Sequence, residues 1–523
     1  MARVLVTEKI APSGLDLLAS AGHDVDVEEG LSPDELVRAV VGAHALIIRS
    51  ATQVTADVLL AGSDLVVVGR AGVGLDNVDV PAATERGVMV VNAPTSNTLS
   101  VAEQAMGLLL AQARNIPQAH AALKEGRWER SKWQGVELHG KVLGIVGLGR
   151  AGSLVAQRAL AFGMRLLAFD PYISAERARA MGVELRSVEE LFAESDFITI
   201  HTPKTPETVG LVGRDILAKA KPGIRIVNTA RGGIVDEEAL ADAIEEGIVA
   251  GAGLDVFATE PPTGSRLLDM SSVVVTPHLG ASTEEAQDKA GVTIAEQVLL
   301  ALSGDFVPYA VNVAASDVSE TVRPYMGLAE QLGRFFASLH DGLPDRLDIE
   351  YQGELAGTGT GILTLSVLKG VFAATTEEPV SYVNAPQLAA QRGLEIRETS
   401  TSTSPNYRSL VTLRSGSHAV AGTLTGAGIQ PEPRVVMVDD HSVEVPPAPH
   451  MLVVRNDDRP GMIGVVGLAL GDAGISISSM AVGPSRGSGT ALMVLTTAEP
   501  APDELLARLH ATDGIVDLHR VLT

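Results

Sequence analysis

The chain has 523 residues, of which 46% are hydrophobic and 20% charged, a composition typical of a globular protein with roughly three or four domains. Its formal net charge of -24 would repel the phosphate backbone of a nucleic acid, and no basic run with interleaved aromatic residues is present, so no nucleic-acid partner is expected. The absence of cysteine excludes disulfides, thiolate nucleophiles and cysteine-ligated metal sites.

The N-terminal segment, MARVLVTEKI, carries charges at Arg3, Glu8 and Lys9 and predicts a first strand, because the core of a signal peptide would be apolar. We therefore expect a cytoplasmic protein. The most membrane-like segment, residues 461–483, is interrupted by Asp472 and by glycine and serine residues. Its first half predicts an amphipathic helix, and no membrane partner is expected.

Two series of strands and helices fill the first part of the chain. Over residues 3–94, short runs of Val, Ile and Leu alternate with helical stretches, which predicts parallel strands joined by crossover helices. A second series of this kind begins at Lys141. Helical stretches over 98–124 and 284–303 would connect the two series, and residues 307–313 would complete the first domain.

The composition changes beyond these two series. Residues 347–445 are rich in Thr, Ser, Gly and Val with frequent turn signals, which predicts a smaller α+β domain. The proline-rich segment 446–449 predicts a linker. After it, the pattern strand, helix, strand, strand, helix, strand predicts a ferredoxin-like βαββαβ unit.

A glycine-rich turn predicts a dinucleotide site. Gly147, Gly149 and Gly152 follow a predicted strand and open a predicted helix, so the backbone can approach a pyrophosphate at the helix N-terminus. Asp170 stands at the end of the next strand, where a carboxylate can accept hydrogen bonds from both ribose hydroxyls and would repel a 2′-phosphate. The pattern therefore favours NAD over NADP.

Three functional side chains stand at or just after strand ends of the same series: Arg231, Glu260 and His278. Ligands bind at the carboxyl ends of strands in open α/β sheets. An imidazole can take the proton of a hydroxyl, a carboxylate can orient the ring, and a guanidinium can bind an α-carboxylate. The alternative for His278 is a hydrogen-bonded loop residue without a catalytic role.

Six segments carry a family resemblance: GRAGVGLDNVD, NAPTSNTLSVAE, GIVGLGRAG, NTARGGIVDEEAL, GAGLDVFATEPP and TPHLGAST. With them the chain resembles the D-isomer-specific 2-hydroxyacid dehydrogenases, and within that family the long-form branch that oxidises 3-phospho-D-glycerate with NAD as the first step of L-serine biosynthesis. The resemblance implies a flavodoxin-like substrate domain (1–97 and 285–313) with an inserted Rossmann NAD domain (98–284), then an α+β intervening domain (314–447) and a ferredoxin-like ACT domain (448–523).

The resemblance also implies residue roles, with His278 as proton donor and acceptor, Glu260 as its orienting acid and Arg231 as binder of the substrate carboxylate. The implied NAD contacts are Val73, Arg150, Ala151, Asp170, Thr202, Thr229, Ala230, Asp255, Gly280 and Ala281. The implied substrate contacts are Gly72 and Val73 at the carboxylate, Arg49, Ser50 and Asn97 at the phosphate, and Arg130 from a neighbouring subunit. The alternative for the arginines assigned to the phosphate is that they are solvated surface residues without a ligand. The alternative for the segment around Arg130, residues 128–133, is a contact between the subunits of a dimer.

A candidate effector site lies in the last unit. Asn456 and Asp458 precede a predicted helix whose N-terminal N–H groups and neighbouring carboxylate suit an amino acid. The resemblance implies L-serine, bound between two such domains. Ser476 stands where serine-sensing relatives often carry an asparagine, and a hydroxyl cannot replace both the donors and the acceptor of an amide, so we expect weak binding. The alternative is a domain that only holds subunits together.

Other functions share the same catalytic core. One alternative is another D-2-hydroxyacid substrate such as 2-hydroxyglutarate, and another is a non-catalytic NAD-sensing binding protein. The terminal domains favour the phosphorylated substrate. The resemblance implies a homo-oligomer, a tetramer. The 12 histidines show no close pair with a carboxylate at ligand spacing, so no metal is expected.

Overall fold

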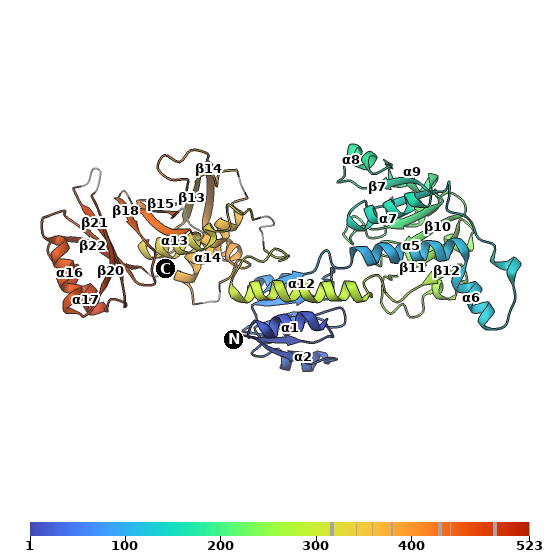
Figure 1. The fold of residues 1–523 in the computed structure, drawn as a ribbon, viewed down its shortest axis with the longest axis horizontal. Coiled ribbons are helices and arrows are strands. Elements are labelled where there is room, and N and C mark those ends of the chain that lie inside the picture. The colour runs from blue at the N-terminus through green and yellow to red at the C-terminus, as the bar shows by residue number, and fades with distance from the viewer. Residues whose placement is uncertain are drawn as a thin grey trace.

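A computed structural model describes residues 1–313, 318–340, 342–357, 359–377, 380–426, 431–439, 441–484 and 489–521. The chain is elongated: the N-terminal unit, on which helix α12 (Glu284–Ser303) packs, lies in the middle, with the NAD-type unit at one end and the two C-terminal units at the other (Figure 1). The predicted border at residue 314 lies outside the described residues, and the other predicted borders stay predictions. Within the described ranges, no helix is long and apolar enough to cross a membrane.

The first sheet is fully parallel and has the strand order β2-β1-β3-β4-β5, which is the flavodoxin-like order. Its elements are β1 (Arg3–Val6), α1 (Pro12–Ser20), β2 (Asp24–Val27), α2 (Pro33–Ala39), β3 (Ala45–Ile48), α3 (Ala56–Ala61), β4 (Val67–Arg70), α4 (Val80–Glu85) and β5 (Met89–Asn92). After α12, Ala310 bridges to Val91 and the Asn312 side chain accepts the N–H of Val90. Residues 307–313 thus rejoin this sheet.

The second sheet is also fully parallel, with the order β12-β11-β10-β9-β6-β7-β8. Its strands are β6 (Val142–Val146), β7 (Arg165–Phe169), β8 (Val183–Leu185), β9 (Phe197–Ile200), β10 (Ile224–Asn228), β11 (Val249–Leu254) and β12 (Val273–Val275). Its helices are α7 (Arg150–Ala161), α8 (Ala175–Ala180), α9 (Val188–Glu194), α10 (Arg214–Leu217) and α11 (Glu237–Glu245), with 3-10 turns η1 (Arg130–Trp133) and η2 (Arg266–Asp269). The Rossmann prediction is confirmed.

The predicted helix over 98–124 is wrong in one respect, because two helices occupy it. Helix α5 (Thr98–Arg114) ends at Asn115, whose φ of 53° is left-handed, and α6 (Ile116–Lys124) starts anew with Pro117 in its first turn. A left-handed residue followed by a proline interrupts the helical hydrogen-bond ladder. The periodicity of the apolar residues continues across the break, so the pattern did not reveal it.

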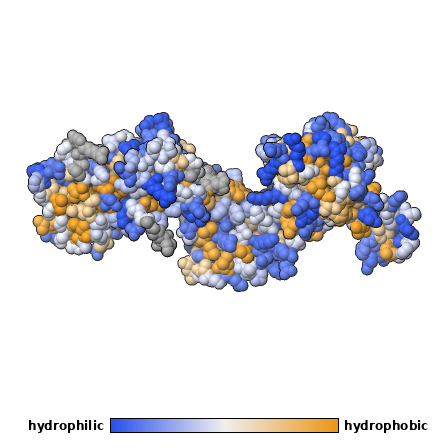
Figure 2. Space-filling model, turned by 45° about the horizontal axis from the view of Figure 1, so that its top comes forward, coloured by the Kyte–Doolittle hydropathy of each residue, from blue (hydrophilic) through white to orange (hydrophobic). Residues whose placement is uncertain are grey.

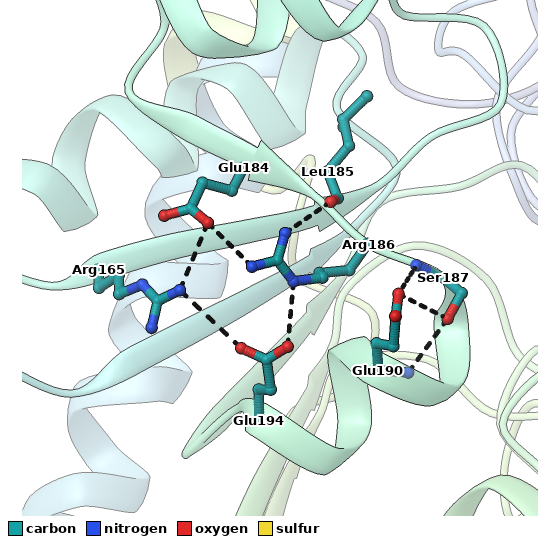
Figure 3. A network of polar contacts seen from close by, with 7 residues as sticks. All are labelled: Arg165, Glu184, Leu185, Arg186, Ser187, Glu190 and Glu194. Carbon is teal, nitrogen blue, oxygen red and sulfur yellow. Dashed lines mark hydrogen bonds and ion pairs between the residues drawn. The ribbon is translucent and has the colours of Figure 1, made fainter.

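Charged side chains cover the outer edge of the second sheet. Figure 3 shows Arg186 between Glu184 and Glu194, with Arg165 reaching the same two carboxylates. Such charges keep an edge strand from pairing with another chain. A capping box between Ser187 and Glu190 then starts α9 and fixes the turn that follows β8.

The third unit has a six-stranded sheet of order β14-β13-β15-β16-β17-β18, and the last unit a four-stranded sheet of order β20-β21-β19-β22. The third unit contains α13 (Tyr325–Leu339), β13 (Arg346–Gly353), α14 (Gly361–Thr375), α15 (Ala385–Gln391), β14 (Glu395–Thr401), β15 (Ser409–Ser415), β16 (His418–Thr425), β17 (Glu432–Val438) and β18 (His441–Val445). The last contains β19 (Met451–Asn456), α16 (Met462–Asp472), β20 (Ile477–Pro484), β21 (Ala491–Thr497), α17 (Asp503–His510) and β22 (Ile515–Val521). The predicted βαββαβ order is confirmed.

The proline-rich segment 446–449 joins two units that share a hydrophobic core. Alternate residues of β19 point to opposite sides of its sheet. Met451 and Val453 belong to the same buried cluster as Leu339 of α13, whereas Leu452 and Val454 pack with α16 and α17. The last sheet is therefore covered on both faces within this chain.

Helices α13 and α14 approach closely through two glycines. A Cβ at Gly333 would lie 2.2 Å from the carbonyl oxygen of Val367, and one at Gly370 would lie 2.0 Å from the carbonyl oxygen of Glu330. Both distances are too short for any side chain, so the two helix backbones lie in direct contact. The Lys369 ammonium also pairs with the Glu330 carboxylate across this contact, at 2.9 Å.

We expect Gly333→Ala to lower the free energy of unfolding by about 1–3 kcal/mol, because the added methyl group overpacks this contact. Gly327→Ala on the exposed side of the same helix meets no atom within 4 Å and should instead stabilise by about 0.5–1 kcal/mol. Denaturant unfolding of both variants measures the difference. Equal stabilities would contradict the close packing.

Candidate active site

A cavity of about 420 Å³ lies between the first two units, at the carboxyl ends of their parallel strands. In doubly wound folds this is where ligands bind, because loops of several strands meet there. Several of the predicted site residues line it: Val73, Asn97, Arg150, Ala151, Thr202, Thr229, Ala230 and Arg231. The structure therefore brings residues from both units to one surface.

The glycine-rich turn has the geometry that a pyrophosphate requires. Gly147 has a φ of 91°, and a Cβ there would lie 2.9 Å from the His201 backbone. A Cβ at Gly152 would lie 2.1 Å from the carbonyl oxygen of Gly147. Glycine is thus required at both positions for the chain to turn and for α7 to begin, with Gly149 at its N-cap. The first two residues of α7, Arg150 and Ala151, line the cavity.

Asp170 is held beside this turn by main-chain donors. One carboxylate oxygen accepts the N–H of Leu148 and the other accepts the N–H of Tyr172, both at 2.8 Å. Asp170 and the three glycines do not themselves line the cavity, but the turn leads into α7, whose Arg150 and Ala151 do. Thr229 also lines the cavity, and its buried hydroxyl has no hydrogen-bond partner among the described residues. An orphaned hydroxyl in the cavity, with a glycine turn and a fixed carboxylate next to it in the fold, fits a dinucleotide.

His278 and Glu260 form a direct pair. The Nδ1 atom of His278 lies 2.7 Å from Oε2 of Glu260, whose Oε1 accepts the N–H of Phe257. The Glu260 carboxylate is therefore fixed by the backbone and in turn orients the ring. The His278 side chain is 47% exposed, so its Nε2 side is accessible. The pair lines a second, apolar cavity of about 400 Å³.

The loop that carries His278 is strained and is pinned by a buried carboxylate. His278 has a φ of 54°, in the left-handed region that non-glycine residues rarely adopt. The fully buried Asp255 accepts the N–H groups of Leu279 and Gly280 at 2.7 and 2.8 Å, and the hydroxyl of Thr276. Asp255, Gly280 and Ala281 do not line the first cavity, and their predicted NAD contacts stay predictions.

Another histidine, His201, lines the first cavity and could compete for the role of base. Its Nε2 lies 2.8 Å from the hydroxyl of Thr199. Burial lowers the pKa of His201 to about 4, so the ring is neutral at pH 7 and is a poor proton acceptor. This leaves His278 as the histidine suited to acid–base chemistry.

Arg231 reaches across the cleft from the second unit. Its Nη1 donates to the carbonyl of Ala230 at 2.7 Å, and its Nε lies 3.4 Å from the carboxylate of Asp76 in the first unit. Arg231 lines the first cavity and the His278 pair lines the second. Of the three predicted catalytic residues, His278 and Glu260 are therefore in direct contact, whereas Arg231 lies in the other cavity, between the two units.

Arg70 was not predicted from the sequence as a site residue. It is the last residue of β4, a position similar to that of the predicted Arg49, which directly follows β3. Its Nε donates to the carbonyl of Arg49 at 3.3 Å, and a Cβ at Gly72 would lie 1.9 Å from its Nη1. Burial and the nearby Arg231 lower the pKa of Arg70. A partly buried guanidinium close to two others implies an anionic ligand, and its place at a strand end was the available signal.

The other predicted substrate residues differ in where they lie. Asn97 lines the first cavity as the residue before α5, whereas Arg130 is exposed in η1 and does not line that cavity. The predicted contact of Arg130 with a neighbouring subunit stays a prediction. Ser50 follows Arg49 in the loop after β3 and is exposed.

The predicted effector residues are only partly available to a ligand. Asn456 is buried, its amide donates to the carbonyl of Ala491 and its oxygen accepts the N–H of Asp458. Asn456 thus braces the loop that carries Asp458, and its predicted role in effector binding stays a prediction. Asp458 and Ser476 are exposed. Across the described parts of the chain, no group of three or more His, Asp or Glu residues could hold a metal ion.

Comparison with known proteins identifies three segments. The family model of the D-isomer specific 2-hydroxyacid dehydrogenase NAD-binding domain matches residues 106–280. The model of the D-3-phosphoglycerate dehydrogenase intervening domain matches 321–439, and that of the ACT domain matches 450–514.

Individual relatives are similar over almost the whole chain. A protein from Mycobacterium bovis named D-3-phosphoglycerate dehydrogenase is 48% identical over 513 residues, which cover 97% of either chain. A protein of the same name from Methanocaldococcus jannaschii is 42% identical over 521 residues and 99% of either chain. The crystal structure of a protein from Thermus thermophilus superposes with a TM-score of 0.56 at 38% identity, over 59% of this chain and 99% of that chain.

We expect His278→Asn to lower kcat by about 10²–10⁴-fold, because the hydroxyl proton loses its acceptor. The affinity for NADH, measured by fluorescence titration, should stay near the unsubstituted value, since His278 lies outside the glycine-rich turn. His120→Asn, an exchange on helix α6 away from the strand ends, serves as the control. Near-normal turnover of His278→Asn would make His278 a loop residue without a catalytic role.

Proposed function

The chain belongs to the D-3-phosphoglycerate dehydrogenases, within the family of D-isomer-specific 2-hydroxyacid dehydrogenases, and from this premise we infer that it oxidises 3-phospho-D-glycerate to 3-phosphooxypyruvate with NAD as the first step of L-serine biosynthesis. The carrying observation is that Arg231 lines the cavity between the units, while the partly buried Arg70 donates to the carbonyl of Arg49 and has its pKa lowered by burial and by the nearby Arg231. A substrate with a carboxylate and a phosphate bears about three negative charges, which three guanidinium groups balance.

The residues around the cleft divide the chemistry between them. Arg231 binds the substrate carboxylate and polarises the neighbouring carbon–oxygen bond. His278 takes the hydroxyl proton at Nε2, because Nδ1 is turned to Glu260. Glu260 orients the ring and stabilises the imidazolium that forms. In the reverse direction the same imidazolium returns the proton to the oxygen.

NAD, when bound, supplies the acceptor for the hydride from the carbon that bears the hydroxyl. The turn at Gly147 and the N-terminus of α7 would hold its pyrophosphate, and Asp170 its ribose hydroxyls. The unpartnered hydroxyl of Thr229 provides a further polar contact within the cavity. The enzyme would work in the cytoplasm, where NAD and phosphorylated acids are available.

The same proposal includes a homo-oligomer, a tetramer. The segment from α6 to η1 protrudes from the NAD-type unit (Figure 1) and exposes Ile116, Leu123 and Trp128 by 54%, 57% and 81%. Figure 2 shows a second apolar area on the last unit, where Leu468 is 70% exposed. Apolar side chains exposed in groups are typical of surfaces that another subunit covers. Arg130 lies on the protruding segment and would face the partner.

L-serine is the proposed ligand of the last unit, where the exposed Asp458 stands before the N-terminus of α16. A carboxylate for the amino group and free helix N–H groups for the carboxylate suit an amino acid. We expect weak binding, in the range of about 1 mM or above, because Ser476 offers only a hydroxyl. Calorimetry should detect serine with the unsubstituted protein and not with Asp458→Ala. If calorimetry detects no heat of binding at L-serine concentrations up to about tens of millimolar, and serine does not change the activity, the last unit serves only to hold subunits together.

The function is tested by Arg49→Ala and a pair of substrates that differ only in the phosphate, 3-phospho-D-glycerate and D-glycerate. We expect KM for the phosphorylated acid to rise about 10- to 100-fold, because a charge-assisted contact is lost, and KM for D-glycerate to change little. Arg38→Ala, at an exposed arginine of the same unit, serves as the control. Equal losses on both acids would reject the phosphate assignment, and no turnover of any 2-hydroxyacid by the unsubstituted protein would favour a binding protein.

A further inference from the structure

Glu8, just after β1, accepts hydrogen bonds from four consecutive main-chain N–H groups. Its Oε1 accepts from Arg49 at 2.8 Å and from Thr52 at 2.9 Å. Its Oε2 accepts from Ser50 at 3.2 Å and from Ala51 at 3.1 Å. The whole loop after β3 therefore closes around one carboxylate that is distant in sequence.

The opposite side of this loop is braced as well. The carbonyl of Arg49 accepts from Nε of Arg70 at 3.3 Å and from Nδ2 of Asn77 at 2.9 Å. The same Asn77 nitrogen lies 2.6 Å from the carbonyl oxygen of Thr52. Because both the N–H and the carbonyl of Arg49 are held, the direction in which its side chain leaves the backbone is fixed.

The charge of Glu8 matters as much as its hydrogen bonds. Four converging N–H groups form an anion-binding concavity, which Glu8 fills from within the protein. Burial by itself raises the pKa of Glu8. The hydrogen bonds from the N–H groups of Thr52, Ala51 and Arg49 together lower it by more than burial raises it, so the pKa lies below its ordinary value. A neutral amide could not satisfy the four donors, since its NH₂ group is itself a donor.

We propose that Glu8 is a positioning residue of the substrate site, which fixes the 49–52 loop so that Arg49 and Ser50 meet the phosphate end of the substrate. The role rests on the proposed function, because it presumes a substrate with a second anionic group. Glu8 does not touch the substrate, and its four acceptor contacts are already used by the loop. Its charge also offsets the effect that Arg231 and Arg49 have on the Arg70 guanidinium, whose pKa they lower and Glu8 raises.

The test is Glu8→Gln, which keeps the size of the side chain and removes its charge. We expect KM for 3-phospho-D-glycerate to rise about 10- to 100-fold, with kcat changed by less than about threefold and KM for D-glycerate nearly unchanged. Glu8→Asp keeps the charge on a shorter side chain. Its KM for 3-phospho-D-glycerate should lie between those of the unsubstituted protein and Glu8→Gln. It also replaces Glu8→Gln as the test variant if the latter does not fold.

Glu35→Gln is the matched control, because Glu35 also accepts a main-chain N–H, that of Ser32, on the surface of the same unit. It should leave both KM values unchanged. Hydrogen exchange of the amides of residues 49–52 gives a readout independent of activity, and we expect it to quicken with Glu8→Gln only. An equal rise in KM for both acids, a fall in kcat alone, or unchanged amide exchange would overturn the positioning role.

These outcomes separate the inference from the function on which it rests. If the unsubstituted protein does not turn over 3-phospho-D-glycerate, the proposed function fails, whatever Glu8 does. If it does, and Glu8→Gln quickens amide exchange without raising KM for the phosphorylated acid, the loop is held by Glu8 but does not position the substrate. In that case Glu8 is a structural residue only.

Discussion

Carboxylates that accept hydrogen bonds from main-chain N–H groups hold in place the loops that follow the strands of the first two units. Glu8 binds the loop after β3, Asp170 the glycine-rich turn, Asp255 the loop of His278, and Glu260 the main chain at Phe257 as well as the His278 ring. Loops at strand ends leave donors without partners, and an ionised acceptor satisfies several of them at once. The site depends on these four contacts, because the functional side chains stand on the loops that they fix.

The cleft combines this rigidity with an excess of positive charge in a strongly acidic protein. Arg49, Arg70 and Arg231 come from three different strand ends and lie near Glu8 and Asp76. In the free protein the two carboxylates offset part of the repulsion between the guanidinium groups. A ligand with two anionic groups would complete the balance, in keeping with the proposed phosphorylated substrate.

The two C-terminal units form one packed body that touches the first, flavodoxin-like unit. The last sheet buries one face against α13, and the Ser381 hydroxyl donates to the carbonyl of Gly87, in the turn before β5. At the other end of β5, the Asn92 amide donates to the carbonyl of Val73 in the first cavity. A continuous set of contacts thus runs from the ACT-type sheet to the cleft, through a core that the proline-rich segment 446–449 does not divide.

The sequence by itself determined the fold class, the glycine turn at Gly147 and the terminal βαββαβ order, because each depends on local spacing or periodicity. The pairing of Glu260 with His278 was expected only from the family resemblance, and the tertiary structure brings the two side chains together. Only the tertiary structure revealed the partly buried Arg70, the loop contacts of Glu8 and the internal engagement of Asn456. Glu8 meets partners more than 40 residues away, and Asn456 meets one 35 residues away. The sequence does not show whether a charged or polar side chain is solvated or buried against the main chain of a distant segment. Only the tertiary structure shows this, because the fold determines which hydrogen-bond partners lie next to the side chain.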